Sequence, residues 1–233
     1  METRLRFVSP PGACAYLPAQ TWQLQYEVVR HLEPDEYLER LQQGWRRIGH
    51  AMFRPVCPSC RLCQSLRIPV DTFHPDRSQR RAWKASCGEV SVMVGSPVLS
   101  HDRLELYRKF HAHQTDTKAW PTPGEDDLLA LIDNPIPTEE WSYRVGNRLV
   151  GVGYVDRVAD GLSAIYFYYD PDERDRSLGT FNVLSVLAAA NDARLPYVYL
   201  GYYIASYPSL AYKARFRPNE VLGPDGRWAR FLE

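Results

Sequence analysis

The sequence has no excess charge of either sign and no long apolar stretch. Its 28 Lys and Arg residues balance 28 Asp and Glu residues, so the formal net charge is zero. No apolar run approaches the roughly 20 residues that cross a bilayer, which argues against a membrane-spanning class and a membrane partner. No internal repeat or low-complexity tract interrupts the chain. The segment from Met1 to Phe7 contains several charged residues, and no apolar run follows it. We therefore expect no signal peptide and a reducing, cytoplasmic location.

What is present is an ordinary globular composition with unevenly spread charge. The 233 residues allow one large or two small domains, and the 45% hydrophobic share is enough for a core. Between Arg40 and Lys84 ten cations stand against two carboxylates, whereas from Asp116 to Glu140 the balance is reversed. We therefore predict a dipolar molecule whose basic segment favours a nucleic-acid partner.

Four cysteines form the most informative pattern. Cys57, Cys60 and Cys63 are spaced two residues apart in one short run, and Cys14 lies far upstream. Thiolates at this spacing converge on one ion or cluster when a tight turn brings them to one side. We predict a centre that holds zinc or an iron–sulfur cluster, with buried free thiols as the alternative. Cys87 has no close partner and is expected to be structural.

The first half of the chain carries several expected helices and strands, of which two helices and one strand bear on the predicted sites. One helix opens at Glu33-Pro34 and continues at helical spacing until Gly49, and a half-buried strand follows over Leu66–Val70. A second helix begins after Asp76 and places one basic face on the surface. We predict that this face binds RNA or DNA, with a merely solvated face as the alternative; its cations are Arg77, Arg80, Arg81 and Lys84.

The second half reads as three strands, a helix and one more strand. The strands are expected over 141–145, 149–156 and 162–170, the helix over 181–191, and the last strand over 197–201 before a short helix at 208–215. An α+β acyltransferase core of the GNAT kind has this order, and several other folds share it. We predict a smaller cysteine-containing, basic domain over 1–95 and a GNAT-like transfer domain over 96–233.

One turn in this half has the character of a reaction site. Ser177-Leu178-Gly179-Thr180 links a strand to a helix, where backbone N–H groups face an anion or a polarised carbonyl. Asp170 comes just before this turn, where a carboxylate steers an amine or merely forms a turn. In the aromatic run at the end of the third strand, alternation puts Tyr166 and Tyr168 on one face and Phe167 and Tyr169 on the other.

Six motifs in order resemble those of the aminoacyl-tRNA–protein transferases. The resemblance is closest to the bacterial aspartate/glutamate leucyltransferases and covers nearly the whole chain. The motifs are Arg46-Arg47-Ile48-Gly49-His50 to Pro55, Cys57 to Cys63, Tyr169-Asp170-Pro171, Ser177 to Thr180, Gly201-Tyr202-Tyr203-Ile204, and Tyr212-Lys213-Ala214-Arg215-Phe216.

The resemblance implies a cytoplasmic enzyme that moves leucine from leucyl-tRNA to the N-terminal amine of proteins that begin with Asp or Glu, marking them for degradation. It also implies a metal or cluster at the cysteines, and no coenzyme A is expected. We predict that the ester carbonyl meets the backbone donors of Leu178, Gly179 and Thr180, and that Asp170 or a tyrosine hydroxyl such as that of Tyr169 orients the amine. An acidic acceptor needs a cation. Predicted substrate-binding residues are Arg47, Arg54, Tyr203, Lys213 and Arg215.

Three other functions stay open on the sequence alone. Arginine is an alternative donor amino acid, because the sequence does not identify the donor pocket. A leucine donor would require an apolar pocket, and an arginine donor a buried carboxylate. An acyl-coenzyme A transferase is disfavoured, because Phe181 replaces the second small residue of the usual pyrophosphate loop. A zinc-knuckle RNA-binding protein would bind RNA without modifying a peptide.

Overall fold

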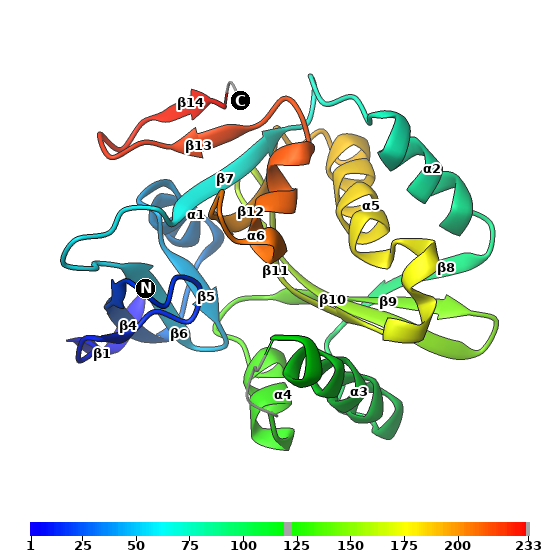
Figure 1. Ribbon diagram of the computed structural model, residues 1–233, viewed down its shortest axis with the longest axis horizontal. Helices are drawn as coiled ribbons and strands as arrows, with labels where there is room; N and C mark the ends of the chain where they lie inside the picture. The colour runs from blue at the N-terminus through cyan, green and yellow to red at the C-terminus, as the bar shows by residue number, and fades with distance from the viewer. Residues whose placement is uncertain (119–122, 232–233) are drawn as a thin grey trace.

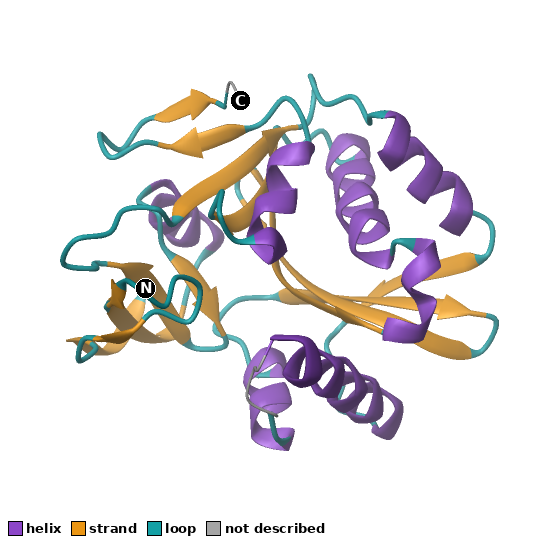
Figure 2. Ribbon diagram, viewed as in Figure 1, coloured by secondary structure: helices purple, strands orange, loops and turns teal. Residues whose placement is uncertain are grey.

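The computed structural model describes residues 1–118 and 123–231, which form a mixed α+β fold around two main sheets (Figures 1 and 2). One sheet has four strands and the other has eight, and a short ribbon pairs β2 (Gly12–Ala13) with β3 (Thr21–Trp22). The predicted α+β class is confirmed, whereas its GNAT-like character stays a prediction. No helix within the described ranges is long and apolar enough to cross a membrane.

The four-stranded sheet is built from the N-terminal part of the chain. Its strands lie in the order β1, β4, β6, β5, and all their pairings are antiparallel. The bounds are Glu2–Val8 for β1, Leu24–His31 for β4, Arg46–Ile48 for β5 and Ala51–Pro55 for β6.

Helix α1 (Pro34–Gln42) is shorter than the sequence predicted. It begins as expected, because the Glu36 carboxylate accepts the backbone N–H of Glu33 at 3.0 Å. It ends before Gly44, whose φ of +81° breaks the helical path. The continuation to Gly49 was therefore wrong: Arg46–Ile48 form strand β5, and Arg46 and Arg47 alternate across it instead of following a helix face.

The eight-stranded sheet carries most of the core. Its order is β14, β13, β7, β12, β11, β10, β9, β8, and among these neighbours only β11 and β12 are described as parallel. The bounds are Gln64–Pro69 for β7, Val90–Gly95 for β8, Thr138–Val145 for β9, Arg148–Val158 for β10, Gly161–Tyr169 for β11, Tyr197–Tyr203 for β12, Glu220–Leu222 for β13 and Trp228–Arg230 for β14.

This sheet runs across the boundary that we expected at residue 95. Strand β7 pairs with β12 and β13, and β8 pairs with β9, so both join strands from the far side of that boundary. Strand β7 is also buried on both faces rather than half-buried. Arg67 is tolerated there because its guanidinium lies 3.7 Å from the Tyr197 ring centroid and its Nε donates to Glu220 at 2.7 Å.

Helices cover both faces of the large sheet, as Figure 1 shows. Helices α2 (Arg77–Ser86) and α5 (Leu178–Asp192) lie on one face, and α3 (His101–Lys118) and α4 (Glu125–Ile132) on the other. Tyr168 packs with α3 and α4, whereas Phe167 packs against the core that contains α5. The alternation predicted for Tyr168 and Phe167 is therefore confirmed, whereas Tyr169, at the end of β11, also contacts Phe110 of α3 at a ring distance of 5.3 Å. Short helical segments complete the chain: 3-10 turns over Pro171–Arg176 and Tyr212–Arg215, and α6 (Pro208–Ala211).

The parallel pair β11 and β12 separates after a short contact. Pairing covers only Gly161 to Ser163 of β11 against Tyr197 to Tyr199 of β12. Beyond these residues β12 continues with β7 as its partner, while β11 stays with β10. The separation leaves room between two strands of one sheet, and the candidate site lies at this place.

Candidate acyl-transfer cleft

A cleft of about 620 Å³ opens where β11 and β12 separate. Its wall comes from both of these strands, from β5 and β10, from the start of α5, and from the segment around α6. The volume lies in the range of small-molecule sites. Among the described residues that line it, none is Asp, Glu or His, and the charged ones are Arg46, Arg47, Arg174 and Lys213.

Arg46 enters the gap between the separated strands. Its side chain is 7% exposed, and it donates to the Ser163 hydroxyl at 3.2 Å and to the Ala164 carbonyl at 2.6 Å, both on β11. On the other side it approaches Gly201 of β12 so closely that a Cβ there would lie 2.9 Å from Arg46 Nε. The described chain thus offers Arg46 neutral oxygens, and its charge stays available to an anion in the cleft.

Arg47 has the opposite environment. Its Nε donates to Asp156 at 2.7 Å, a second N–H reaches the other carboxylate oxygen, and both side chains are fully buried. The remaining N–H groups donate to the Gly49 carbonyl, Asn134 and Thr138. Because this charge is neutralised within the fold, the prediction that Arg47 binds the acceptor carboxylate is not supported. Its neighbour Arg46 was not among the predicted site residues. Among the described residues, its guanidinium meets neutral oxygens and no carboxylate.

The start of α5 lies in the cleft wall, but the helix begins at Leu178 after a 3-10 turn, not at 181 after a strand. Ser177 adopts a left-handed conformation (φ 52°), and its carbonyl accepts the N–H of Thr180 at 2.9 Å. The amide of Thr180 is therefore used inside the helix. The amides of Leu178 and Gly179 are in the first turn, where no helical partner exists. A Cβ at Gly179 would meet nothing within 4 Å, so a substrate atom can approach this backbone closely.

Asp170 lies outside the cleft lining, although Tyr169 is part of it. The Asp170 carboxylate is 5% exposed, receives Arg148 at 2.9 Å and Lys109 at 2.5 Å, and accepts the backbone N–H of Asp172. It holds the turn before α5 by these bonds, so its predicted role beside the attacking amine has no geometric support. The pKa of Tyr169 is raised by burial, which keeps its hydroxyl protonated and able to donate.

The other predicted substrate-binding residues divide between the cleft and its surroundings. Lys213 lines the cleft. Tyr203 is 4% exposed and packs its ring 5.1 Å from that of Phe231, as a core residue. Arg54 donates to Gln25 at 2.9 Å and lies over the Trp45 ring, and Arg215 is exposed outside the lining residues.

The basic face of α2 is confirmed as an exposed surface. Asp76 caps the helix by accepting the Gln79 N–H at 2.8 Å, and all four predicted cations are exposed. Figure 1 shows α2 alongside α5, and Trp83 of α2 lies 5.2 Å from the Phe181 ring of α5. The helix that carries the basic face therefore packs against α5, whose first turn forms part of the cleft wall. Its role in binding RNA stays a prediction.

The four cysteines act on one another electrostatically without forming a metal site as they stand. The pKa of Cys63 is raised to about 12, by burial first and then by the charges of Cys57, Cys14 and Cys60. Cys57 is buried and its Sγ lies 3.7 Å from the Gln23 carbonyl. No group of three or more His, Cys, Asp or Glu side chains in the described ranges is arranged to hold a metal ion. Metal binding at the four cysteines stays a prediction.

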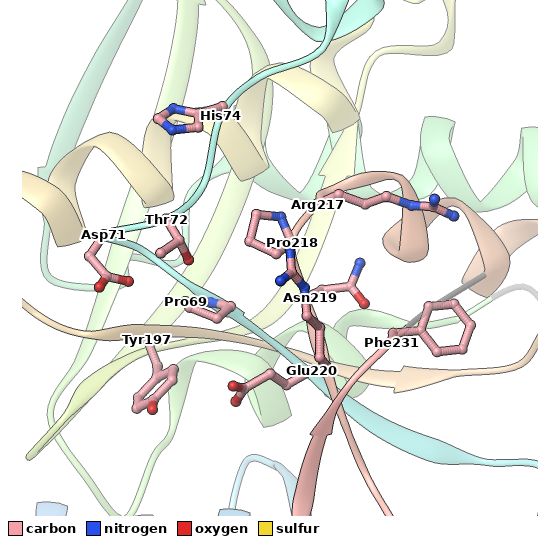
Figure 3. Close-up of a pocket in the computed structure, with 11 residues that line it drawn as sticks. Pro69, Asp71, Thr72, His74, Tyr197, Arg217, Pro218, Asn219, Glu220 and Phe231 are labelled. Carbon is pink, nitrogen blue, oxygen red and sulfur yellow. The ribbon is translucent and has the colours of Figure 1, made fainter.

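A larger cavity of about 830 Å³ lies at the other end of β12 (Figure 3). Tyr197 and Pro69 line it, with residues from the segment that leads into β13. It contains Asp71 and Glu220, the latter already paired with Arg67, and none of the predicted site residues. The smaller cleft is the stronger candidate site, because a helix start meets a buried arginine there that has neutral partners among the described residues.

Solved structures share this mixed α+β fold. L-PGS from Bacillus licheniformis aligns with 73% of this chain and 59% of its own, with a TM-score of 0.51 and 13% identity. The C-terminal domain of a protein described as a lysylphosphatidylglycerol synthetase from Agrobacterium fabrum aligns over the same shares of the two chains, with a TM-score of 0.52 and 12% identity. At these identities the likeness concerns the fold alone.

The sequence comparisons give the family. Residues 12–81 match the family model of the arginine-tRNA-protein transferase N terminus, and residues 102–223 match that of its C terminus. The aspartate/glutamate leucyltransferase of Nitrosococcus oceani is 37% identical over 97% of this chain and 96% of its own. That of Halorhodospira halophila is 36% identical over 94% of each chain. The chain belongs to the aminoacyl-tRNA–protein transferase family, and the resemblance to its bacterial leucyltransferase branch is confirmed.

Proposed function

We propose that this chain transfers leucine from leucyl-tRNA to the N-terminal amine of polypeptides that begin with Asp or Glu, and that in the cytoplasm the added leucine marks them for degradation. The observation that carries the acceptor side of the proposal is Arg46. It is a buried guanidinium with neutral protein partners, inside a cleft whose described lining has no carboxylate. A carboxylate on the first acceptor residue supplies its missing counter-charge.

The same lining favours leucine over arginine as the donor amino acid. A donor arginine needs a buried carboxylate, and the described lining offers none. A donor leucine needs apolar surface, which Phe110, Val155, Ile165 and Leu210 supply at the wall. Relatives named aspartate/glutamate leucyltransferase, at 36% and 37% identity, agree with this choice.

The chemistry requires positioning more than activation. The aminoacyl ester is already reactive, so holding ester and amine together supplies much of the rate. The ester carbonyl oxygen fits against the amides of Leu178 and Gly179, which stabilise the negative charge that develops during attack. Tyr169, which stays protonated, is available as a further donor at this wall.

The tRNA is proposed to lie along the basic face of α2. This face is exposed, and α2 packs on α5, the helix that begins at the cleft. Contacts between phosphates and Arg or Lys provide most non-specific affinity for nucleic acid. A tRNA held there can direct its charged end toward the start of α5. A metal at the cysteines is not needed for any of these steps.

The proposal is tested by offering the purified protein labelled leucyl-tRNA, arginyl-tRNA or acetyl-coenzyme A together with peptides that begin with Asp, Glu, Asn or Lys. We expect label in the Asp and Glu peptides with leucyl-tRNA as the donor. Label from arginyl-tRNA would make the chain an arginyltransferase, and label from acetyl-coenzyme A would overturn the proposal. RNA binding without peptide labelling would favour the non-enzymatic alternative.

Arg46→Met tests the acceptor site. Charged hydrogen bonds are worth about 1.5–3 kcal/mol, so kcat/KM for the Asp peptide should fall about 10- to 150-fold. The control is Arg157→Met, which removes an exposed arginine 3.7 Å from Glu139. The Asn peptide, a poor acceptor, should lose little further activity in the Arg46 variant. An unchanged preference for Asp over Asn would place the acceptor carboxylate elsewhere.

A further inference from the structure

The described residues that line the cleft do not include the groups that usually take protons at neutral pH. An α-amine has an ordinary pKa near 8 and arrives mostly as an ammonium ion, which cannot attack an ester until it loses a proton. The described lining includes no Asp, Glu or His, and Asp170 is held outside it by Lys109 and Arg148. Tyrosine hydroxyls in the wall, such as those of Tyr166 and Tyr169, have pKa values raised by burial and do not act as bases.

Among the described residues that line the cleft, Lys213 is the one side chain that can be neutral near pH 7 and then accept a proton. It lies on the 3-10 turn Tyr212–Arg215, is partly buried, and its Nζ donates to the Tyr202 carbonyl of β12 at 2.8 Å. The charged group that acts on it is Arg46 of β5, and β12 faces it with this neutral carbonyl. Burial first, and then the positive charge of Arg46, lower the pKa of Lys213 to about 7.

We propose that Lys213 is the catalytic residue that accepts the proton from the α-ammonium of the acceptor. The inference rests on the proposed function. One N–H of neutral Lys213 is bound to the Tyr202 carbonyl, which leaves its lone pair for the substrate. This assigns to Lys213 a role different from the carboxylate-binding cation that the sequence suggested, a role that Arg46 fills.

The proton and bond changes balance without another reactant. Lys213 Nζ takes one proton from the ammonium, and the neutral amine attacks the ester carbonyl carbon, so that a C–N bond forms. The bond between that carbon and the ribose oxygen then breaks, and the oxygen leaves with the second proton of the former ammonium. The ammonium of Lys213 returns its proton to solvent, and the polypeptide is longer by one residue.

Arg46 connects acceptor recognition to this step. While the cleft is empty, its charge disfavours the protonated form of Lys213. An acceptor carboxylate on Arg46 offsets that charge and raises the proton affinity of Lys213. The pH at which kcat rises should therefore be higher for an Asp acceptor than for an Asn acceptor.

The decisive experiment compares Lys213→Arg and Lys213→Met with the wild type and with Lys109→Arg, an exposed lysine that keeps its partners Asp170 and Asp172 as arginine. Leucyl transfer to an Asp peptide is measured with saturating leucyl-tRNA from pH 6 to 9. An arginine keeps the positive charge but cannot accept a proton near neutrality. If Lys213 is the base, both Lys213 variants should lose about 100-fold in kcat at pH 7, with KM for the peptide within about threefold.

The outcomes separate the inference from the proposed function. Wild-type leucyl transfer supports the function whatever the variants do, and its absence overturns the function. Wild-type kcat in Lys213→Arg overturns the inference, and so does a raised KM with unchanged kcat, which would show a carboxylate-binding cation. The variants are compared at equal affinity for leucyl-tRNA and at a temperature at which circular dichroism shows each of them to be fully folded.

A measurement on the wild type alone covers the case in which the variants fail to fold. The pH dependence of reductive methylation at each lysine, read by mass spectrometry, reports where each side chain becomes neutral. Lys213 should reach half of its maximal rate near pH 7. Lys109, whose pKa is raised by hydrogen bonds to Asp170 and Asp172, is the internal reference. A midpoint for Lys213 as high as that for Lys109 would overturn the inference.

Discussion

Asp156→Asn should destabilise the protein strongly, because it leaves the buried charge of Arg47 without its partner. Both side chains are fully buried, and Asp156 receives the Nε of Arg47 at 2.7 Å and the Thr138 hydroxyl at 2.7 Å. The asparagine keeps the shape and one acceptor oxygen but removes the negative charge. The substitution therefore isolates the electrostatic contribution from packing.

The expected loss follows from the burial of this pair. Removing one partner of a buried ion pair costs about 3–5 kcal/mol. For a protein of this length each kcal/mol lowers the melting temperature by about 2–4 °C, so we expect a decrease of about 6–20 °C. Arg47 fixes strand β5, which also carries Arg46. The rate of transfer to Asp peptides should therefore fall even at temperatures at which the variant is still folded.

The assay is thermal unfolding followed by circular dichroism, with guanidinium unfolding as a second measure. The double variant Arg47→Met with Asp156→Leu removes both charges and should recover at least half of the loss, because apolar replacement of a buried pair is often neutral. Arg157→Met, on the same strand but exposed, should melt within about 1 °C of the wild type. A melting temperature of Asp156→Asn within about 2 °C of the wild type would refute the reasoning.

Two further predictions concern charge elsewhere in the fold. The folded pKa of Lys213 is about 7 against 10.5 ordinarily, so the unfolded chain binds more protons between these values and this group makes stability rise with pH across that window. Lys213→Met removes the effect, so its melting temperature relative to the wild type should be higher at pH 7 than at pH 10; a constant difference would contradict the assignment. Arg80→Glu with Arg81→Glu should weaken leucyl-tRNA binding and flatten its dependence on salt in filter-binding assays, and unchanged binding at moderate salt would remove α2 from the tRNA footprint.

Local signals in the sequence predicted the elements that depend on neighbouring residues. Asp76 and Gln79 cap α2 within four residues, and alternation placed Tyr168 and Phe167 on opposite faces of β11. The motif around Gly179 marked the start of α5 and its position in the cleft. Each of these follows from the chemistry of residues close in the chain, which sequence reading can use directly.

The different partners of Arg46 and Arg47 could not be predicted from neighbouring residues in the same way. Treating them as the end of a helix hid the alternation of a strand, although Gly44 and Gly49, both with positive φ, were signals of a break. Even with the strand recognised, the choice depends on Asp156, which lies 109 positions further along the chain. The pairing of Asp170 with Lys109 is equally remote in sequence.

Arg46, whose guanidinium meets only neutral partners among the described residues, has a consequence for how many residues the proposed enzyme adds. In the proposed function, Arg46 binds one position, the first side chain of the acceptor. After one turnover that position holds leucine, which has no charge to offer, and the acidic residue has moved one place inward. The elongated product is then a weak competitor for fresh acceptors, so the fold itself limits the extension to one residue without a separate stop signal.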